Sequence, residues 1–218
     1  DDRVQVKRGF GAHPYSISSA PADDGRLSVI VEAQGETTRR IQAIVDDDEA
    51  RALVHGAYGR LAYAHHETTP QLWLGGGIGI TPFLSLAEEL AAAPGGRDVV
   101  LVAGVDHAAA AFFAERLSAC EERARGALRV IVWNREERGV PTVEALREEI
   151  PDLAERAVLM SGPEPMISAL THQLHAAGVS RIHSEVTIGP PRRWRYGSPG
   201  LRFMRGVIAV EMVLFVAA

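Results

Sequence analysis

The sequence has a single cysteine, Cys120, among its 218 residues. One cysteine excludes a disulfide within the chain, and it excludes a four-cysteine iron–sulfur cluster held by this chain alone. Cys120 follows Phe113 and Leu117 at helical spacing. We therefore expect it to lie in the hydrophobic core, with a redox role as the alternative.

A basic block is absent from the first 190 residues, and the formal net charge of the chain is −5. Both observations argue against nucleic acid as the main partner. Histidines come in two pairs, His65 with His66 and His172 with His175, and neither pair has a third ligand nearby in the sequence. The sequence therefore predicts no metal site, and it places His172 and His175 on a solvated helix face.

The composition, 46% hydrophobic and 23% charged, is that of a folded chain with room for one large or two small domains. Up to about residue 70, short alternating runs are separated by Gly, Pro and Asp. Examples are LSVIVEA (27–33) and ARALVH (50–55). This part is predicted to form antiparallel strands.

From residue 71 onward, apolar strand-like runs alternate with helical patterns. Four such β-α units and a closing strand are typical of an α/β doubly wound parallel sheet. Its ligands are expected at the carboxyl ends of the strands. The runs are QLWL (71–74), DVVLVAG (98–104), ALRVIVW (127–133), RAVLMSG (156–162) and SRIHSEVTI (180–188), and the helical patterns span 81–90, 108–123, 142–149 and 163–177.

Four glycines stand between the first strand and the first helix of this sheet, in the stretch QLWLGGGIGITPFLSL (71–86). Thr81 is expected to cap the helix with its hydroxyl, and Pro82 suits the first helical position. Such a turn presents free backbone N–H groups to a phosphate, although a tight turn without a ligand remains the alternative. The strict G-x-G-x-x-G fingerprint fails, because its third glycine position holds Ile80.

Six motifs in order carry a family resemblance. The chain resembles the ferredoxin–NADP reductase superfamily over roughly residues 4–188, and within it most of all the ferric reductases and NADPH oxidases. The resemblance implies a partial, antiparallel FAD-binding β-barrel domain at 1–66, shorter than is usual, an NAD(P)-binding α/β domain at 70–188, and a tail at 189–218. The motifs are HPYSISSAP (13–21), GETTRRI (35–41), GAYGRL (56–61), GGGIGITPFLSL (75–86), SGPEPM (161–166) and IHSE (182–185).

For FAD, the resemblance implies that the run HPYS forms the strand against which the flavin ring lies. Tyr15 would stack on the flavin, and Ser16 would donate a hydrogen bond near N5, the atom that accepts hydride. A barrel strand with an ordinary core tyrosine is the alternative. A second segment would hold the FAD pyrophosphate, with Thr38 as a plain N-cap otherwise. The implied FAD residues are His13, Pro14, Tyr15, Ser16, Gly35, Thr38 and Arg39.

For NAD(P)H, the resemblance implies that the glycine loop passes beneath the pyrophosphate and that Ser161, in place of the family's cysteine, approaches the nicotinamide. Glu185 would lie near the flavin and nicotinamide as a proton relay or orienting group, with a solvated glutamate as the alternative. Ser16, Ser161 and Glu185 are the candidate catalytic residues. The implied NAD(P)H-binding residues are Gly76, Gly77, Ile78, Gly79, Thr81, Ser161, Gly162 and Pro163.

The resemblance implies an enzyme that transfers hydride from NAD(P)H to FAD and passes electrons to a separate acceptor. Ferric iron, a haem or iron–sulfur protein, and a quinone are the candidate acceptors. Two alternatives stay open: a catalytically weak regulatory or electron-transfer subunit with a truncated barrel, and a nucleotide-binding α/β enzyme without flavin. Asp106, after the second strand of the sheet, favours NADH over NADPH.

The tail 189–218 interleaves arginines with aromatic residues and ends in an apolar run from 207 to 218, which is too short to span a bilayer. Peripheral contact with a membrane is one expectation, and a strand that packs on the domain is the other. The expected location is cytoplasmic, with the inner face of the membrane as the surface contacted.

Overall fold

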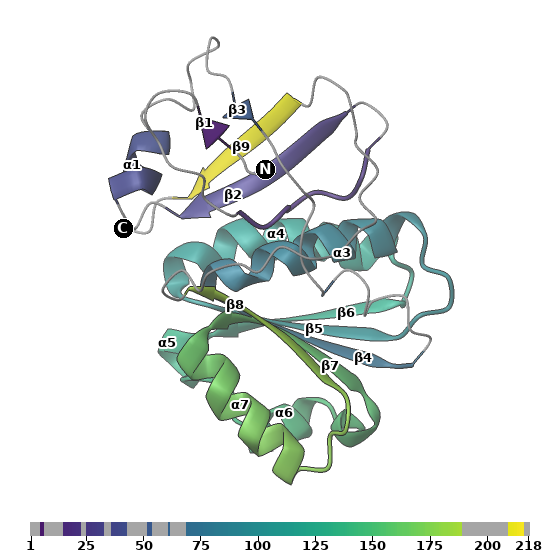
Figure 1. Cartoon of the computed structure of the whole chain (residues 1–218). Coiled ribbons are helices and arrows are strands. Elements are labelled where there is room, and N and C mark those ends of the chain that lie inside the picture. The colour runs from purple at the N-terminus through teal and green to yellow at the C-terminus, as the bar shows by residue number, and fades with distance from the viewer. Residues whose placement is uncertain are drawn as a thin grey trace, which may run out of the picture.

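The computed structural model describes residues 5–6, 15–22, 25–32, 36–42, 52–53, 61, 69–188 and 209–215. It shows a layered α/β structure with a smaller group of strands above it (Figure 1). His13, Pro14 and Gly35 of the predicted flavin site lie outside the described residues. The layered part, residues 69–188, is described without a gap.

Five parallel strands form the sheet, in the order β6-β5-β4-β7-β8. The first of them along the chain, β4, lies in the centre and pairs with both β5 and β7, so the strand order reverses there. This is the doubly wound sheet that the sequence predicts. The strands are β4 (Gln71–Gly76), β5 (Val99–Val105), β6 (Leu128–Asn134), β7 (Ala157–Pro163) and β8 (Ile182–Ile188).

Helices cover both faces of this sheet, with α3 and α4 on the face toward the smaller group of strands and α5, α6 and α7 on the other (Figure 1). Alternate residues of a strand point to opposite faces. Accordingly Trp73 belongs to the core under α3 and α4, whereas Leu72 and Leu74 belong to the core under α6 and α7. The helical elements are η1 (Gly77–Ile80), α3 (Thr81–Ala92), α4 (His107–Arg123), α5 (Arg135–Arg138), α6 (Val143–Glu149), η2 (Leu153–Glu155) and α7 (Glu164–Ala176).

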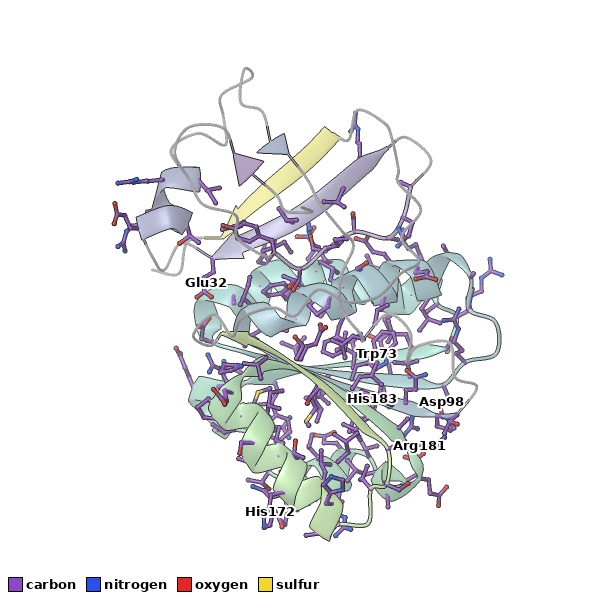
Figure 2. All side chains as sticks on the ribbon, in the orientation of Figure 1. Glu32, Trp73, Asp98, His172, Arg181 and His183 are labelled. Atoms are coloured by element: carbon purple, nitrogen blue, oxygen red, sulfur yellow. The ribbon has the colours of Figure 1, made fainter. Side chains whose placement is uncertain are left out.

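Cys120 lies in the first of these cores, as the helical spacing predicts. It is 2% exposed. Burial, together with the nearby carboxylate of Glu88, raises the pKa of its thiol. A raised pKa keeps the sulfur protonated and unreactive at neutral pH. His172 and His175 are both exposed on α7, which confirms that they lie on a solvated helix face. Figure 2 shows His172.

At the amino end of the sheet, the buried side chain of Arg156 holds neighbouring strands together; it is 7% exposed. Its guanidinium donates to both carboxylate oxygens of Asp98, at 3.0 and 3.1 Å, and to the backbone carbonyl of Gln71 at 3.2 Å. It also pairs with Asp152 at 2.9 Å. The hydrogen bond from Arg156 holds the pKa of Asp152 below its ordinary value. This network ties the start of β7 to its neighbour β4 and to the residue before β5.

The smaller group of strands differs in one respect from the antiparallel arrangement that the sequence predicts. Antiparallel pairing does join β1 (Gln5–Val6) to β3 (Ala52–Leu53), and it joins Ile17 to Val29. However, β2 (Arg26–Glu32) pairs along its whole length with β9 (Ala209–Phe215), and this pairing is parallel. The antiparallel prediction is therefore wrong for this pair. An alternating pattern of apolar and polar residues predicts which side chains of a strand are buried. It does not predict which other strand pairs with it, or in which direction.

The tail is predicted either to contact a membrane or to pack as a strand on the domain. Residues 209–215 form β9, so this part of the tail is a strand paired with β2. The remaining tail residues lie outside those that the structure describes. Within the described residues, no helix is both long enough and apolar enough to cross a membrane. The predicted boundaries at 66, 70 and 188 stay predictions.

Candidate functional site

Two loops meet where the strand order reverses. Gly75, at the end of β4, pairs in register with Ser161 of β7, and Ser161 pairs with Glu185 of β8. Three residues that the sequence singles out or places in a motif therefore lie at one level across neighbouring strands. This level is the carboxyl end of the sheet, where doubly wound folds bind their ligands.

Contacts between these two loops explain several of the glycines. A Cβ atom on Gly79 would lie 2.6 Å from the carbonyl carbon of Ser161 and 2.7 Å from the Cα of Gly162. A Cβ on Gly76 would lie 2.9 Å from the Cε of Met166. Real Cβ atoms do not come this close to other heavy atoms. Gly79 is therefore required by protein packing, whether or not a ligand lies against it, because its neighbours are backbone atoms. At Gly76 the neighbour is the end of the flexible Met166 side chain, which can move.

Gly77 is different, because nothing lies within 4 Å of the position that its Cβ would take. Its φ of 56° is in the left-handed region, which glycine adopts without steric strain. The loop therefore leaves open space at this one glycine, which is a surface that a ligand can approach.

The start of α3 corrects one prediction. Thr81 does not cap the helix: it is the first residue of α3, and its hydroxyl donates to the carbonyl oxygen of Ile78 at 2.8 Å. The reason is that η1 runs directly into α3, so Thr81 already has helical backbone angles. No side chain caps this helix at Ile80, and Pro82 is its second residue.

Ser161 is fully buried, and its Oγ atom has no hydrogen-bond partner among the described residues. A buried hydroxyl without a partner is costly for stability, so such an atom calls for an explanation. Gly162 and Pro163 follow it at the end of β7, and Met166 packs over Gly162. The unpartnered hydroxyl thus lies where the loop after β7 contacts the glycine loop.

Glu185 is partly buried on β8, at the edge of the sheet. Glu185 pairs in register with Ser161, so it lies near the carboxyl end of the sheet. The sequence left two roles open for it, a group near the reacting centre and a solvated glutamate. Its position in register with Ser161 is compatible with the first role, which stays a prediction.

The segment with Tyr15 and Ser16 leads into residues that are bonded to α3. Ser85 of α3 donates its hydroxyl to the Ser19 carbonyl at 2.7 Å, and the Ala20 N–H donates to Glu88 at 2.9 Å. Both Tyr15 and Ser16 are partly buried. Burial raises the pKa of Tyr15, so its phenol stays neutral and can donate a hydrogen bond.

Thr38 and Arg39 lie in the short helix α1 (Glu36–Gln42). Thr38 is partly buried and Arg39 is exposed, and both take part in polar or electrostatic contacts. Thr38 is the third residue of the helix and not the residue before it, so the interpretation of Thr38 as an N-cap is wrong. Glu36 at the helix start forms an ion pair with Arg40.

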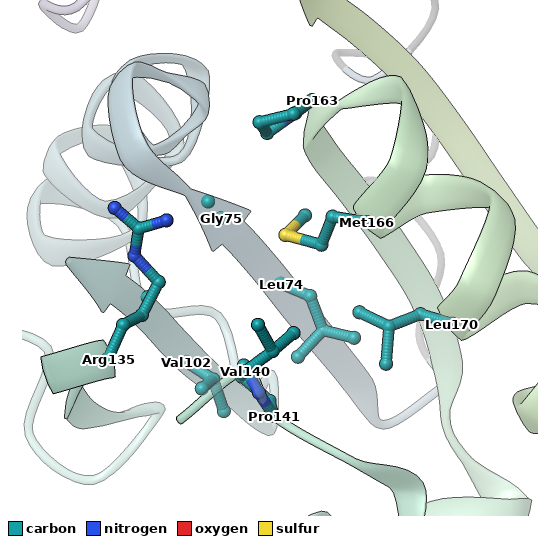
Figure 3. Close-up of a pocket in the computed structure, with 11 residues that line it drawn as sticks. Leu74, Gly75, Val102, Arg135, Val140, Pro141, Pro163, Met166 and Leu170 are labelled. Carbon is teal, nitrogen blue, oxygen red and sulfur yellow. The ribbon is translucent and has the colours of Figure 1, made fainter. Parts of the chain in front are cut away.

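A small notch opens beside the two loops, on the face of the sheet that α7 covers (Figure 3). Its volume is ≈ 60 Å³. Two of its lining residues, Gly76 and Pro163, are among the predicted NAD(P)H-binding residues. Val140, Pro141 and Leu170 also line it, and none of them belongs to a motif that the sequence analysis singles out. The lining residues are Leu74, Gly75, Gly76, Val102, Gly104, Arg135, Val140, Pro141, Pro163, Met166 and Leu170.

Arg135 brings a positive charge to this otherwise apolar notch. The structure places it at the mouth of the notch, 3.6 Å from the carboxylate of Asp106 (Figure 3). A signal was present in the sequence, because Asp106 and Arg135 each come two residues after a predicted strand.

The position of Glu32 shows which end of the sheet the end of β2 lies over. Figure 2 shows Glu32, at the end of β2, on the side of the sheet's carboxyl ends, and Asp98 on the opposite side. The end of β2 thus lies on the same side of the molecule as the two loops.

Comparisons with known proteins agree with this arrangement. Residues 73–172 match the family described as the oxidoreductase NAD-binding domain. The chain is 30% identical over 185 residues to the ferredoxin reductase component of 3-ketosteroid-9-alpha-monooxygenase from Mycolicibacterium smegmatis. That match covers 83% of this chain and 51% of the relative, so the chain spans about half the relative's length.

Two solved structures share the fold. One is a flavohemoglobin from Malassezia yamatoensis with bound FAD and heme, at a TM-score of 0.66 and 22% identity, covering 84% of this chain and 50% of that one. The other is a ferredoxin NADP+ reductase from Neisseria gonorrhoeae with bound FAD and NADP. Its TM-score is 0.64 at 20% identity, and the match covers 86% of this chain and 85% of that one.

Proposed function

The chain belongs to the ferredoxin–NADP reductase superfamily, and from this premise we propose that it is an FAD-dependent oxidoreductase that takes electrons from NADH or NADPH and passes them to a separate acceptor. One observation carries the proposal: the glycine loop after β4 and the Ser161 loop after β7 meet at the point where the strand order reverses. FAD, when bound, accepts the two electrons of the nicotinamide and releases them one at a time.

The residues at the two loops fit a dinucleotide. Gly77 offers open backbone to a pyrophosphate, and the uncapped start of α3 adds the positive end of a helix dipole. The Oγ of Ser161 has no partner among the described residues, and a carboxamide of the nicotinamide can supply one. Glu185, level with Ser161, is the group that would orient the ring or hold a proton beside it.

We further propose that residues 15–32 are part of an FAD-binding β-barrel. The antiparallel bridge from Ile17 to Val29 supports this, as do the bonds from Ser85 and to Glu88 that fix the segment on α3. Tyr15 would lie against the flavin, and Ser16 would donate a hydrogen bond to it. A second hydroxyl of this segment, that of Ser18, is buried without a partner among the described residues, so the segment has unused hydrogen-bonding capacity.

The proposed acceptor is a separate redox protein. The Mycolicibacterium smegmatis relative is named as one component of a monooxygenase, which supports an iron–sulfur or haem protein as the acceptor over ferric iron or a quinone.

The test is an anaerobic absorbance spectrum of the purified chain reconstituted with FAD, before and after addition of NADH and then NADPH. We expect the flavin bands to bleach with at least one donor. The flavin-free chain with the same donor is the control. A protein that binds FAD but stays oxidised with both donors would instead be the weak or regulatory subunit, and one that binds only dinucleotide would be an enzyme without flavin.

The location is a separate proposal: cytoplasmic, with the arginine- and aromatic-rich residues 189–206 against an anionic membrane surface. Flotation with anionic liposomes tests it, with neutral liposomes as the control. Equal soluble fractions in the two samples would rule out electrostatic membrane contact.

A further inference from the structure

Asp106 and Arg135 face each other at the carboxyl ends of two neighbouring strands. Asp106 follows β5, and Arg135 follows β6. The Nη2 atom of Arg135 lies 3.6 Å from the Oδ2 atom of Asp106, and both side chains are partly exposed. The other carboxylate oxygen of Asp106 accepts a hydrogen bond from the Ala109 N–H at 3.0 Å. The carboxylate is thus fixed by the helix on one side and by Arg135 on the other.

We infer that Asp106 makes this chain select NADH and reject NADPH. The inference rests on the proposed function. The two donors differ only at the adenosine ribose, where NADH has a 2′-hydroxyl and NADPH a 2′-phosphate. An acid after the second strand of a doubly wound sheet accepts a hydrogen bond from the hydroxyl, whereas an arginine there accommodates the phosphate. This chain has both residues, and the ion pair engages the arginine.

The charges around the pair act in the same direction. Arg135 is the first residue of α5, and Glu136 and Glu137 follow it. Arg138, the other cation of this short helix, lies over the ring of Trp133 at 3.5 Å and bonds to Glu149 at 2.9 Å. Asp106, Glu136 and Glu137 therefore outnumber the one cation of α5 that faces Asp106. A phosphate group, with its nearly two negative charges, would be repelled from this surface.

The pair also adjoins the proposed dinucleotide site. Arg135 lines the same notch as Gly75 and Gly76 of the glycine loop (Figure 3). A dinucleotide extended from that loop along the carboxyl ends of the strands reaches β5 and β6 next, because β5 pairs with β4 and β6 with β5. Asp106 is therefore on the adenosine side of the loop, away from Ser161.

The test compares the whole chain with Asp106→Asn and with the double variant Asp106→Asn/Arg135→Gln, each reconstituted with FAD. Asparagine caps a helix as well as aspartate does, so the first substitution removes the charge and keeps the start of α4. We expect kcat/KM for NADH to exceed that for NADPH by about tenfold or more in the unaltered chain. Asp106→Asn should shrink this ratio by about tenfold, and adding Arg135→Gln should reverse the gain for NADPH.

A second readout needs neither flavin nor turnover. Calorimetry measures binding of 5′-AMP and of 2′,5′-ADP, which differ only by the 2′-phosphate. We expect the unaltered chain to favour 5′-AMP and Asp106→Asn to gain affinity for 2′,5′-ADP. An unaltered chain that favours the phosphorylated nucleotide, or an Asp106→Asn variant with unchanged preference, would overturn the inference. Nucleotide discrimination without flavin bleaching would refute the proposed function while supporting the role of Asp106.

Discussion

The two ends of the parallel sheet are built in opposite ways. At the amino end, Arg156 bonds to Asp98, to Asp152 and to the Gln71 carbonyl, so this buried guanidinium is paired. At the carboxyl end, Ser161 keeps a buried hydroxyl without a partner among the described residues, and Gly77 leaves open space. Arg156 thus ties the strands together at one end, whereas the other end combines an unpartnered hydroxyl with open backbone, which is typical of functional sites.

Gly79→Ala should have the largest effect, at the carboxyl end. The new Cβ would meet backbone atoms of Ser161 and Gly162, which cannot move without disturbing β7. We expect a loss of about 3 kcal/mol in the free energy of unfolding. Urea unfolding measures it, with Gly77→Ala as the matched control. That control meets no neighbour and carries only the strain of its positive φ, about 1 kcal/mol. Equal losses in the two variants would mean that the loops do not touch.

Arg156→Met should have the next largest effect, at the amino end. It removes the bonds to the Gln71 carbonyl and to two aspartates, and we expect a loss of about 2 kcal/mol in the free energy of unfolding. Dinucleotide affinity should not change, since this end lies away from the loops. Arg147→Met is the control, because Arg147 is exposed and donates only to the Ala177 carbonyl. A change in affinity would show that the two ends are coupled.

The same end predicts a pH dependence. Asp152 has a lowered pKa in the folded protein because Arg156 donates a hydrogen bond to it. A lowered pKa means that the contribution to stability is present above the unfolded carboxyl pKa of about 3.9, and that it is lost as pH falls through the folded value. We expect Arg156→Met to flatten the fall in stability below about pH 4. Parallel curves for the two proteins would contradict this.

Ser161→Ala should have the smallest effect on stability, and of the opposite sign. Removing a buried hydroxyl that has no partner in the described part of the chain should leave the free energy of unfolding unchanged or raise it by about 1 kcal/mol. Ser85→Ala is the control, because its hydroxyl donates to the Ser19 carbonyl and its loss should lower stability by about 1 kcal/mol. Flavin reduction should slow in Ser161→Ala. A destabilised Ser161→Ala would show that the hydroxyl has a structural partner.

The sheet domain was predictable because its signals are local. Apolar runs and helical spacing place its five strands and its longer helices within one or two residues of the observed bounds. The meeting of Gly75 with Ser161 was predictable as well, since carboxyl ends of neighbouring strands share an edge. The hydroxyl of Thr81 was misassigned because η1, which lengthens the helical segment at its start, leaves no signal in side-chain spacing.

Other features depend on residues far apart in the sequence. The partner of β2 is β9, and no alternation pattern specifies it. The reason for glycine at position 79 is the backbone of Ser161, and that contact becomes visible only when both loops are in place. The sequence analysis favoured a ligand for these glycines and kept a tight turn without a ligand as the alternative. The structure shows that packing requires Gly79, whereas Gly77 is the open position of the loop.

The pairing of β2 with β9 also orders events during protein synthesis. The sheet formed by residues 71–188 contains all of its own strands, so it can fold as soon as that stretch has left the ribosome. Strand β2 is made earlier but must wait for residues 209–215, and contacts between such distant segments form slowly. The surface that carries Tyr15 and Ser16 therefore matures last, after the nucleotide-binding half is already in place.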